Sequence, residues 1–268
     1  MRDDILEDAT ARDLLQLFGT GRQCGSLSIP DMAAAGRIAD LIRAAREARG
    51  ERPVGRKIGF SNRAIWANYG VDRPLWNYVW DTTLHTWSDA DEPIDLATFA
   101  EPRIEPEIVF HLARAPEPGM DEAALLGCID RVAHGFEVVQ SVYPGWRFTA
   151  PDAAAAFGLH GALILGPWRD VDGGRADWLA RLQDFTVILR KDGAEVEVGH
   201  AQNVLGGPLT ALRNLVETIA SDTPGAALGA GEVVSTGTLT DAYPVAPGAA
   251  WSTEFEGIDL SGLRVSFR

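Results

Sequence analysis

Glu101-Pro-Arg-Ile-Glu-Pro-Glu-Ile-Val-Phe110 is a β-type run that places two carboxylates, Glu105 and Glu107, two residues apart. In an extended strand the side chains of residues i and i+2 lie on the same face, about 7 Å apart. The strand is therefore acidic on the face that carries both glutamates. The opposite face is apolar and carries Ile104, Pro106, Ile108 and Phe110.

This spacing has two interpretations. Two unpaired carboxylates that close repel each other unless a cation or a shared proton lies between them. Carboxylate oxygens suit Mg²⁺ or Mn²⁺ better than Zn²⁺. Alternatively the acidic face is solvated, and Arg103 on the same side neutralises one glutamate. The stretch alone leaves both interpretations open.

Composition limits the class of protein. The chain has 268 residues, of which 46% are hydrophobic, as expected for one large domain or for a domain with a helical annex. A net charge of −14 argues against binding to nucleic acid or to an anionic membrane. The two cysteines, Cys24 and Cys128, form no CxxC motif, so neither a disulfide framework nor a zinc site is indicated. With an acidic N-terminus and no long apolar run, we expect a soluble cytoplasmic protein.

The order of sequence patterns predicts an α+β fold. Helical spacing of apolar residues, with Ser28 as a possible cap of the second helix, marks residues 1–52 as a helical N-terminal region. From residue 53 to residue 268, short β-type runs separated by Gly, Pro and Asp indicate a β-rich catalytic domain. Within it, we expect a helix over residues 121–133, a hairpin turn at Asp192-Gly193 and a helix after Gly206-Gly-Pro208.

Lys57 and Glu137 are candidate site residues because of their neighbours. Lys57 shares its strand face with Gly55 and Gly59, so no Cβ crowds the ammonium and a ligand could approach. Its alternative interpretation is an exposed lysine on an edge strand. Glu137 lies in an apolar run, where an unpaired carboxylate is costly, which makes it a candidate third metal ligand. It could equally be an edge-strand glutamate that faces water.

Three further features are candidates for binding or proton transfer. His160, in Gly158-Leu-His-Gly161, could act as an acid or base because its ordinary pKa lies near neutrality, or could cap or pack. The segment from Trp66 to Trp87 is rich in aromatic residues, which could line a pocket, a subunit contact or the core. Asp81 lies within this segment. Near the C-terminus, the alternation of Thr236, Thr238 and Thr240 places their hydroxyls on one strand face.

Taken in order, several motifs resemble the fumarylacetoacetate hydrolase superfamily. They are Gly55-Arg-Lys-Ile-Gly, Pro102-Arg-Ile-Glu-Pro-Glu-Ile, Phe136-Glu-Val-Val, Asp152 with the alanine run, Leu205-Gly-Gly-Pro-Leu and Ser235-Thr-Gly-Thr-Leu-Thr. Within the superfamily, the chain is similar to the branch of 2-keto-4-pentenoate hydratases and 4-oxalocrotonate decarboxylases. The resemblance covers about residues 50–268 and implies a mixed β-sandwich or roll body beside the helical N-terminal region.

The resemblance also implies roles for individual residues. Glu105, Glu107 and Glu137 would be the three ligands of Mg²⁺ or Mn²⁺, which favours the metal interpretation of the opening stretch. Lys57 would lie near the 2-oxo acid end of the substrate. Thr240 belongs to the terminal strand motif that lines the substrate site.

The chain departs from the family pattern at two places. Leu75 stands where hydratases and decarboxylases usually carry an acidic residue, unless Asp81 takes over that role. Ala155-Ala156-Phe157 replaces the usual Ala-Asp-Asn, and His160 lies just beyond. The metal ligands are thus retained, whereas the acid/base residues differ.

The function implied by the resemblance is that of a metal-dependent hydratase, a hydro-lyase. It would act on a 2-hydroxy-dienoate or 2-oxo-alkenoate of an aromatic meta-cleavage type of catabolic pathway. His160 or Asp81 would move protons, and Trp76, within the aromatic segment, would contact an apolar tail. The alternatives are a 2-oxo acid decarboxylase, an acylpyruvate-type C–C hydrolase on the same metal site, and a non-catalytic homologue that binds a 2-oxo acid. The resemblance further implies a homo-oligomer.

Overall fold

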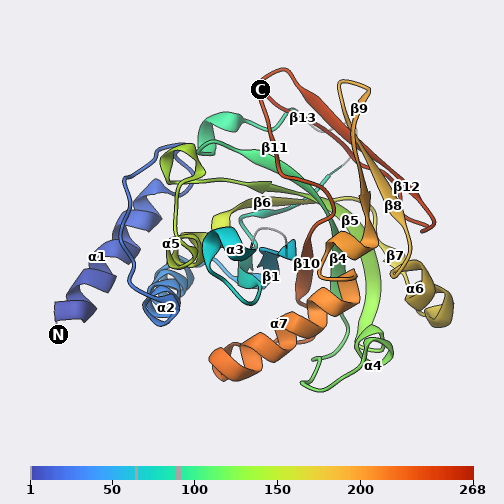
Figure 1. Cartoon of the computed structure of the whole chain (residues 1–268), viewed down its shortest axis with the longest axis horizontal. Coiled ribbons are helices and arrows are strands. Elements are labelled where there is room, and N and C mark those ends of the chain that lie inside the picture. Colours follow the sequence, from blue (N-terminus) through green and yellow to red (C-terminus); the bar gives the residue numbers. More distant parts are fainter. Residues whose placement is uncertain (1, 64–65, 88–91) are drawn as a thin grey trace.

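Two β-sheets form the centre of the computed structural model, which describes residues 2–63, 66–87 and 92–268 (Figure 1). Within these residues the larger sheet has nine strands, in the order β2-β1-β10-β4-β5-β6-β3, with β11 beside β4 and β7 beside β5. Its strands are β1 (Pro53–Gly59), β2 (Leu75–Trp80), β3 (Leu84–Thr86), β4 (Arg103–Leu112), β5 (Ile129–Val139), β6 (His160–Leu165), β7 (Arg169–Asp170), β10 (Val233–Thr238) and β11 (Tyr243–Pro244).

The smaller sheet has the order β13-β12-β8-β9. Its strands are β8 (Thr186–Lys191), β9 (Ala194–His200), β12 (Ala250–Glu256) and β13 (Arg264–Ser266). Strands β8 and β9 form the hairpin predicted at Asp192-Gly193, where both turn residues have positive φ, 52° and 83°. Asp-Gly tolerates that conformation, so the hairpin prediction is confirmed.

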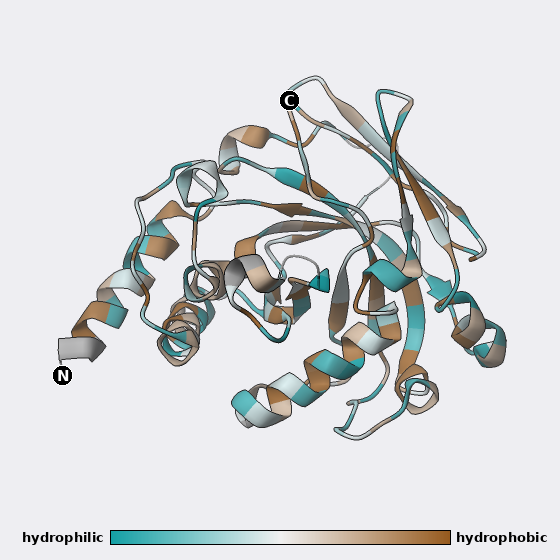
Figure 2. Cartoon of the chain, viewed as in Figure 1, coloured by the Kyte–Doolittle hydropathy of each residue, from teal (hydrophilic) through white to brown (hydrophobic). Residues whose placement is uncertain are grey.

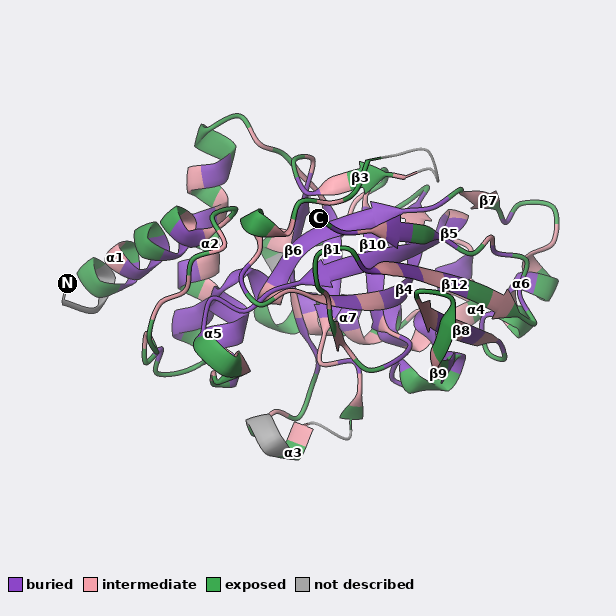
Figure 3. Ribbon diagram, turned by 90° about the horizontal axis from the view of Figure 1, so that it is seen from above, coloured by how far each residue is buried: buried purple, intermediate pink, exposed green. Residues whose placement is uncertain are grey.

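Strand β4 adopts the extended conformation expected of the opening stretch and lies between β10 and β5. The side chains of its apolar face, among them Ile104, Ile108 and Phe110, are fully buried. Of these residues, Ile104 packs with Phe136, Trp251 and neighbouring residues in the core between the two sheets. Figure 3 shows these central strands as almost continuously buried. The acidic face of β4 therefore points into the curl of the larger sheet.

Helix α7 (Pro208–Asp222), together with α4 (Glu122–Leu126) and α6 (Arg175–Arg181), supplies much of a second core. Apolar and polar residues alternate around α7 in Figure 2, as expected for a helix with one buried face. The helix predicted after Gly206-Gly-Pro208 is thus confirmed.

The helix predicted over residues 121–133 is wrong in extent. Helix α4 ends at Leu126, and β5 begins at Ile129. Ile129 and Val132 pair with β4 opposite Leu112 and Phe110. β-Branched side chains fit this pleated, buried surface better than a helix, and the sheet pairing overrides the helical spacing.

Helices α1 (Arg2–Leu17) and α2 (Met32–Ala48) precede the first strand and pack with α5 (Ala150–Ala155) around a separate apolar cluster. Asp31, not Ser28, caps α2: its side chain accepts a hydrogen bond from the Ala34 amide, at 2.8 Å. The helix therefore starts at Met32 rather than before Pro30. The described residues also form a short helix α3 (Trp66–Tyr69) and the 3₁₀ turns η2 (Leu96–Thr98), η3 (Pro144–Trp146), η4 (Phe157–Leu159), η5 (Ala201–Asn203) and η6 (Pro224–Ala226).

These layers confirm the α+β class with a mixed, curled β body and helices at the N-terminus. Among the described residues, no helix has both the length and the apolar character needed to cross a membrane.

Candidate metal centre

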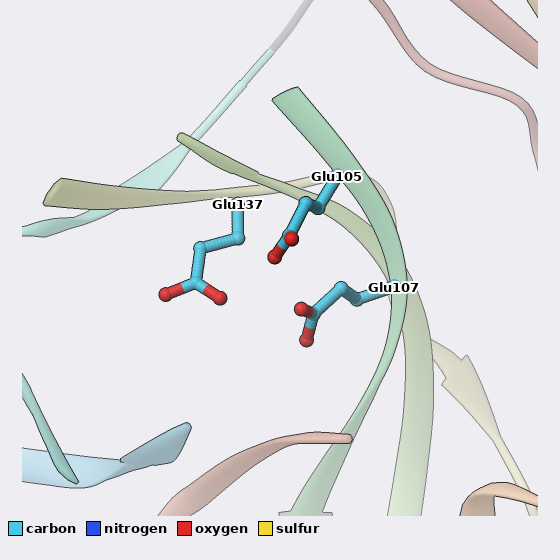
Figure 4. A group of neighbouring side chains, drawn as sticks. All are labelled: Glu105, Glu107 and Glu137. Carbon is cyan, nitrogen blue, oxygen red and sulfur yellow. The ribbon is translucent and has the colours of Figure 1, made fainter. Parts of the chain in front are cut away.

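The register of β4 and β5 brings the three predicted glutamates together. Glu105 lies directly opposite Glu137, and Glu107 follows on the same face. One carboxylate oxygen of each residue lies within 4.8 Å of the others, and Figure 4 shows the three side chains converging. Glu107 and Glu137 are fully buried, and Glu105 is half-buried. Like charges opposite each other destabilise a sheet, so this arrangement calls for a cation.

The hydrogen bonds of Glu107 and Glu137 leave one oxygen of each for a ligand. Glu107 Oε2 accepts bonds from Ser235 Oγ, at 2.5 Å, and from the Gly237 amide, at 2.9 Å. Glu137 Oε1 accepts a bond from His160 Nδ1, at 2.7 Å. Within the described part of the chain, Glu107 Oε1 is buried without a hydrogen-bond partner, and Glu137 Oε2 is buried with only the Lys57 ammonium as an ion-pair partner, at 3.2 Å. These two carboxylate oxygens and Glu105 form an all-oxygen donor set that fits a hard divalent cation.

Lys57 lies beside this centre. It is on β1 between β2 and β10, and its side chain is buried, so the edge-strand interpretation is wrong. Its Nζ lies 3.2 Å from Glu137 Oε2 and donates a hydrogen bond to the Gly158 carbonyl, at 3.0 Å. A Cβ on Gly59 would lie 3.5 Å from Nζ, which agrees with the expected open space around the ammonium.

Burial and charge together perturb the pKa values of the centre. Burial raises the pKa of Glu105 and of Glu107 to about 8, with Lys57 opposing the rise in both. Burial opposes the charge of Lys57, but Glu137 and the other two carboxylates outweigh it and raise the lysine pKa. A divalent cation together with Lys57 would balance the three carboxylate charges. Burial lowers the pKa of His160 well below its usual value, so its imidazole is neutral.

A cavity of about 360 Å³ opens onto the metal centre. Its polar lining includes Lys57, Ser61, Arg103, Glu105, Thr238, Thr240 and Asp241, and its apolar lining includes Phe60, Leu75, Val139, Trp146, Phe148 and Leu159. The Arg103 guanidinium lies 4.2 Å from the ring centre of Trp146. Arg103 has no ion pair among residues 2–63, 66–87 and 92–268. The cavity therefore combines Lys57 and the Glu105 carboxylate with apolar walls, and Arg103 adds a second positive charge to its lining.

Of the other predicted site residues, some line the cavity and others do not. Thr240 lines the cavity, whereas His160 is buried behind Glu137 and does not. Asp81 lies at the surface after β2, 3.1 Å from Arg52 Nε, and the hydrogen bond from the Arg52 amide lowers its pKa. The geometry brings neither Asp81 nor Trp76 to the cavity.

Trp76 lies on the opposite face of β2 from Leu75, because side chains alternate along a strand. Its ring stacks over the Arg56 guanidinium at 5.5 Å, and it borders a second cavity of about 450 Å³ between α2, β2 and α7. Leu75, which occupies the usual acidic position, borders both cavities.

Arg103, which the sequence suggests only as a charge that neutralises one glutamate, lines the cavity. Sequence reasoning missed three further contributors to the site, which are Ser235, the Gly237 amide and Thr83. A signal existed for the first two, since a glycine inside a strand often marks a bulge. The pairing of β10 with β4 indeed shifts register between Ser235 and Thr238. This bulge also breaks the expected alternation of threonines: Thr236 Oγ1 bonds the Ile108 carbonyl instead of facing the cavity.

Known proteins resemble this chain over most of its length. No family model matches the chain. A 4-oxalocrotonate decarboxylase of a Pseudomonas species is 30% identical over 224 residues, 84% of this chain and 83% of the relative. A 2-keto-4-pentenoate hydratase of Paraburkholderia xenovorans is 29% identical over 96% of this chain and 97% of the relative.

A solved structure matches the entire fold. It is the 4-oxalocrotonate decarboxylase from Pseudomonas putida G7 complexed with magnesium and adipate, with a TM-score of 0.87 and 26% identity over 100% of this chain and 98% of that one. The chain belongs to the fumarylacetoacetate hydrolase superfamily, in the branch of 4-oxalocrotonate decarboxylases and 2-keto-4-pentenoate hydratases.

Proposed function

We propose that this protein is a divalent-metal-dependent hydratase, a hydro-lyase that adds water to a 2-hydroxy-dienoate or 2-oxo-alkenoate. The observation that carries the proposal is the set of three converging glutamates beside Lys57, of which Glu105, together with Lys57, lines a cavity of about 360 Å³. A hydratase relative aligned over 96% of this chain supports the same activity.

Glu105, Glu107 and Glu137 would hold the cation, which we propose to be Mg²⁺ or Mn²⁺. When bound, the ion supplies Lewis-acid stabilisation of the enolate form of a 2-oxo acid. Lys57 Nζ adds a fixed positive charge at the same end of the cavity, held there by the Gly158 carbonyl. The apolar walls then surround the carbon chain of the substrate, and Thr238 and Thr240 add polar groups to the lining.

Proton transfer must involve a group that reaches the substrate. Among the described residues that line the cavity, the titratable side chains besides Arg103 are Lys57, Glu105 and Asp241. We therefore assign proton transfer to these groups or to a water molecule that they hold. Both ring nitrogens of His160 are occupied by Glu137 and Thr83, which argues against its serving as the proton carrier.

A second candidate reaction is decarboxylation of a 2-oxo diacid, and Arg103 favours it. An unpaired guanidinium stacked on Trp146 in the cavity wall suits a second carboxylate at the far end of the substrate. The similar decarboxylase structure contains the dicarboxylate adipate. The homo-oligomer implied by the resemblance stays a prediction, and light scattering after size-exclusion chromatography tests it.

The deciding experiment incubates the Mg²⁺-loaded protein with 2-hydroxypenta-2,4-dienoate and, in separate reactions, with 2-oxohex-3-enedioate and with an acylpyruvate. Loss of dienol absorbance with formation of a 4-hydroxy-2-oxo acid supports the hydratase. Release of CO₂ from the diacid alone supports the decarboxylase, and pyruvate release from an acylpyruvate would identify a hydrolase. Metal-dependent binding without turnover of any of the three indicates a non-catalytic homologue.

Glu107→Gln provides the matched test of the metal centre. It preserves the shape of the side chain but removes a ligand charge, so metal-dependent turnover is expected to fall at least 100-fold. The control is Glu256→Gln, which makes the same change at an exposed position on β12 and should leave turnover unchanged. Activity of Glu107→Gln close to that of the unmodified protein contradicts the proposed centre.

A further inference from the structure

His160 contacts Glu137 of the metal centre and does not line the cavity. It is the first residue of β6, is 1% exposed, and is absent from the cavity lining. Its Nδ1 lies 2.7 Å from Glu137 Oε1, and its Nε2 lies 2.9 Å from Thr83 Oγ1. Thr83 is itself fixed in the turn after β2, because its hydroxyl accepts a bond from the Trp80 amide, at 3.1 Å.

The chemistry of these contacts sets the direction of the hydrogen bond. An ionised carboxylate can only accept, so the proton between His160 and Glu137 belongs to Nδ1. The ring then occupies Oε1 and leaves Oε2 of Glu137 to the cationic side, where it already faces the Lys57 ammonium at 3.2 Å. The His160 ring therefore determines which oxygen of Glu137 faces a cation.

Glu107 is held in a parallel way. Ser235 Oγ and the Gly237 amide occupy Oε2 of Glu107 and leave its Oε1 free. For Glu105, in contrast, no side-chain hydrogen bond is found among residues 2–63, 66–87 and 92–268. Two of the three glutamates thus have a dedicated partner that fixes the carboxylate, and His160 is that partner for Glu137.

The segment before His160 supports a positioning role. Phe157, Gly158 and Leu159 all have positive φ, at 58°, 59° and 66°. Left-handed backbone at the two non-glycine residues of this turn, Phe157 and Leu159, is strained and persists only where the surroundings enforce it. This turn directs the Gly158 carbonyl to Lys57 and delivers the His160 ring to Glu137, so one segment sets both neighbours of the carboxylate.

We propose that His160, held by Thr83, is a positioning residue that fixes the Glu137 carboxylate for the metal and takes no part in proton transfer. The inference rests on the metal centre of the proposed function. Partners that orient metal ligands typically contribute 10–100-fold to metal affinity. Loss of the Nδ1 donor is therefore expected to weaken metal binding far more than it lowers turnover at saturating metal.

The test measures Mn²⁺ binding by electron paramagnetic resonance, with the melting temperature followed in parallel. The amide of His160→Asn lies near the position of Nδ1, whereas that of His160→Gln lies near the position of Nε2. We expect His160→Asn to keep the Mn²⁺ dissociation constant within about threefold and His160→Gln to raise it at least 10-fold. The matched control is His111→Gln, since His111 Nδ1 bonds the Asp130 carboxylate at 2.6 Å outside the site, and it should leave Mn²⁺ affinity unchanged.

Turnover at saturating Mn²⁺ separates positioning from proton transfer. A positioning role predicts that kcat of His160→Gln recovers to within about fivefold, whereas a lost acid or base costs about 100-fold or more at any metal concentration. A persistent 100-fold loss of kcat, or equal Mn²⁺ affinity in all His160 variants, overturns the inference.

If the His160 variants do not fold, Thr83→Val decides the question. It removes the hydroxyl that fixes the ring, and at least a threefold loss of Mn²⁺ affinity supports the inference, while unchanged affinity overturns it. If the unmodified protein binds no Mn²⁺, the proposed function itself fails, which is a result distinct from either of these.

Discussion

At the scale of single residues, the three glutamates combine burial with mutual repulsion. Glu105 and Glu107 have pKa values raised to about 8 by burial, so near neutral pH they hold protons when no cation is present. Metal ligands must be deprotonated, and protons therefore compete with the ion for the same oxygens. Metal affinity consequently rises with pH until Glu105 and Glu107 are both ionised even when no cation is bound.

This competition predicts proton release on metal binding. Calorimetric titration of the metal-free protein with Mg²⁺ at pH 7, in two buffers of different ionisation enthalpy, should show release of about one proton or more. At about pH 9.5, above the raised pKa values, the release should vanish and the affinity should be higher. Equal binding heats in both buffers at pH 7 would contradict the assigned protonation of Glu105 and Glu107.

At the scale of elements, the bulge of β10 shapes the metal centre. Gly237 has φ of 104°, and its amide reaches Glu107 because the strand departs from regular pairing there. A Cβ at this position would lie 2.3 Å from Ser61 Oγ and 2.4 Å from Ser61 Cβ. Only glycine satisfies both the left-handed backbone and this close approach.

Gly237→Ala is expected to lower the free energy of unfolding by about 2 kcal/mol or more and to weaken Mn²⁺ binding. The control is Gly248→Ala, where φ is 83° but a Cβ would meet nothing within 4 Å. That change introduces backbone strain alone, about 1 kcal/mol, and should leave Mn²⁺ affinity intact. Urea denaturation and Mn²⁺ titration measure both effects, and identical behaviour of the two variants would refute the role of the bulge.

At the scale of the whole molecule, the N-terminal helices and the β body share a buried cluster. Leu14 of α1 and Ile38 of α2 pack in the same cluster as Leu75 of β2 and Tyr143. The Arg46 guanidinium, from α2, lies 4.6 Å from the ring centre of Phe18 and 4.5 Å from that of Trp80. These contacts favour a single unfolding transition, although the sequence suggests a boundary near residue 52.

Leu14→Ala tests this cooperativity. Leu14 is fully buried, so the substitution should cost about 2–5 kcal/mol and shift one common transition seen by tryptophan fluorescence and by far-ultraviolet circular dichroism. Ile5→Ala changes an exposed side chain of the same helix and should alter stability by about 0.5 kcal/mol or less. Two separated transitions in the Leu14→Ala variant would show that residues 1–52 unfold independently.

How much of the site the sequence predicts depends on how far apart in the sequence the interacting residues lie. The shared face of Glu105 and Glu107 depends only on strand periodicity and could be predicted locally. The placement of Glu137 opposite Glu105 depends on the pairing of two strands, which only the family resemblance indicated. The contact of His160 with Thr83 joins positions 77 residues apart, and no local pattern encodes it.

The wrong predictions for Trp76 and Asp81 have a similar origin. Aromatic density predicts Trp76 in the substrate site, but Trp76 shares a face of β2 with Tyr78, and both rings stack with Arg56. Strand alternation applied to this segment places Leu75 and Asn77 together on the other face, the one that Lys57 shares by register. Asp81 follows the last residue of β2, where the chain turns to the surface.

The fixed carboxylates of Glu107 and Glu137 bear on how the ion is captured. Since the restraints on these groups come from Ser235 and His160 of the chain itself, their rotational freedom is lost during folding and not at the moment of capture. A protein sample from which a chelator has removed the metal therefore keeps a preformed site. The rate at which metal restores its activity is then set by the rate at which the ion loses its bound water. Mg²⁺, which dehydrates reluctantly, would restore the enzyme more slowly than Mn²⁺.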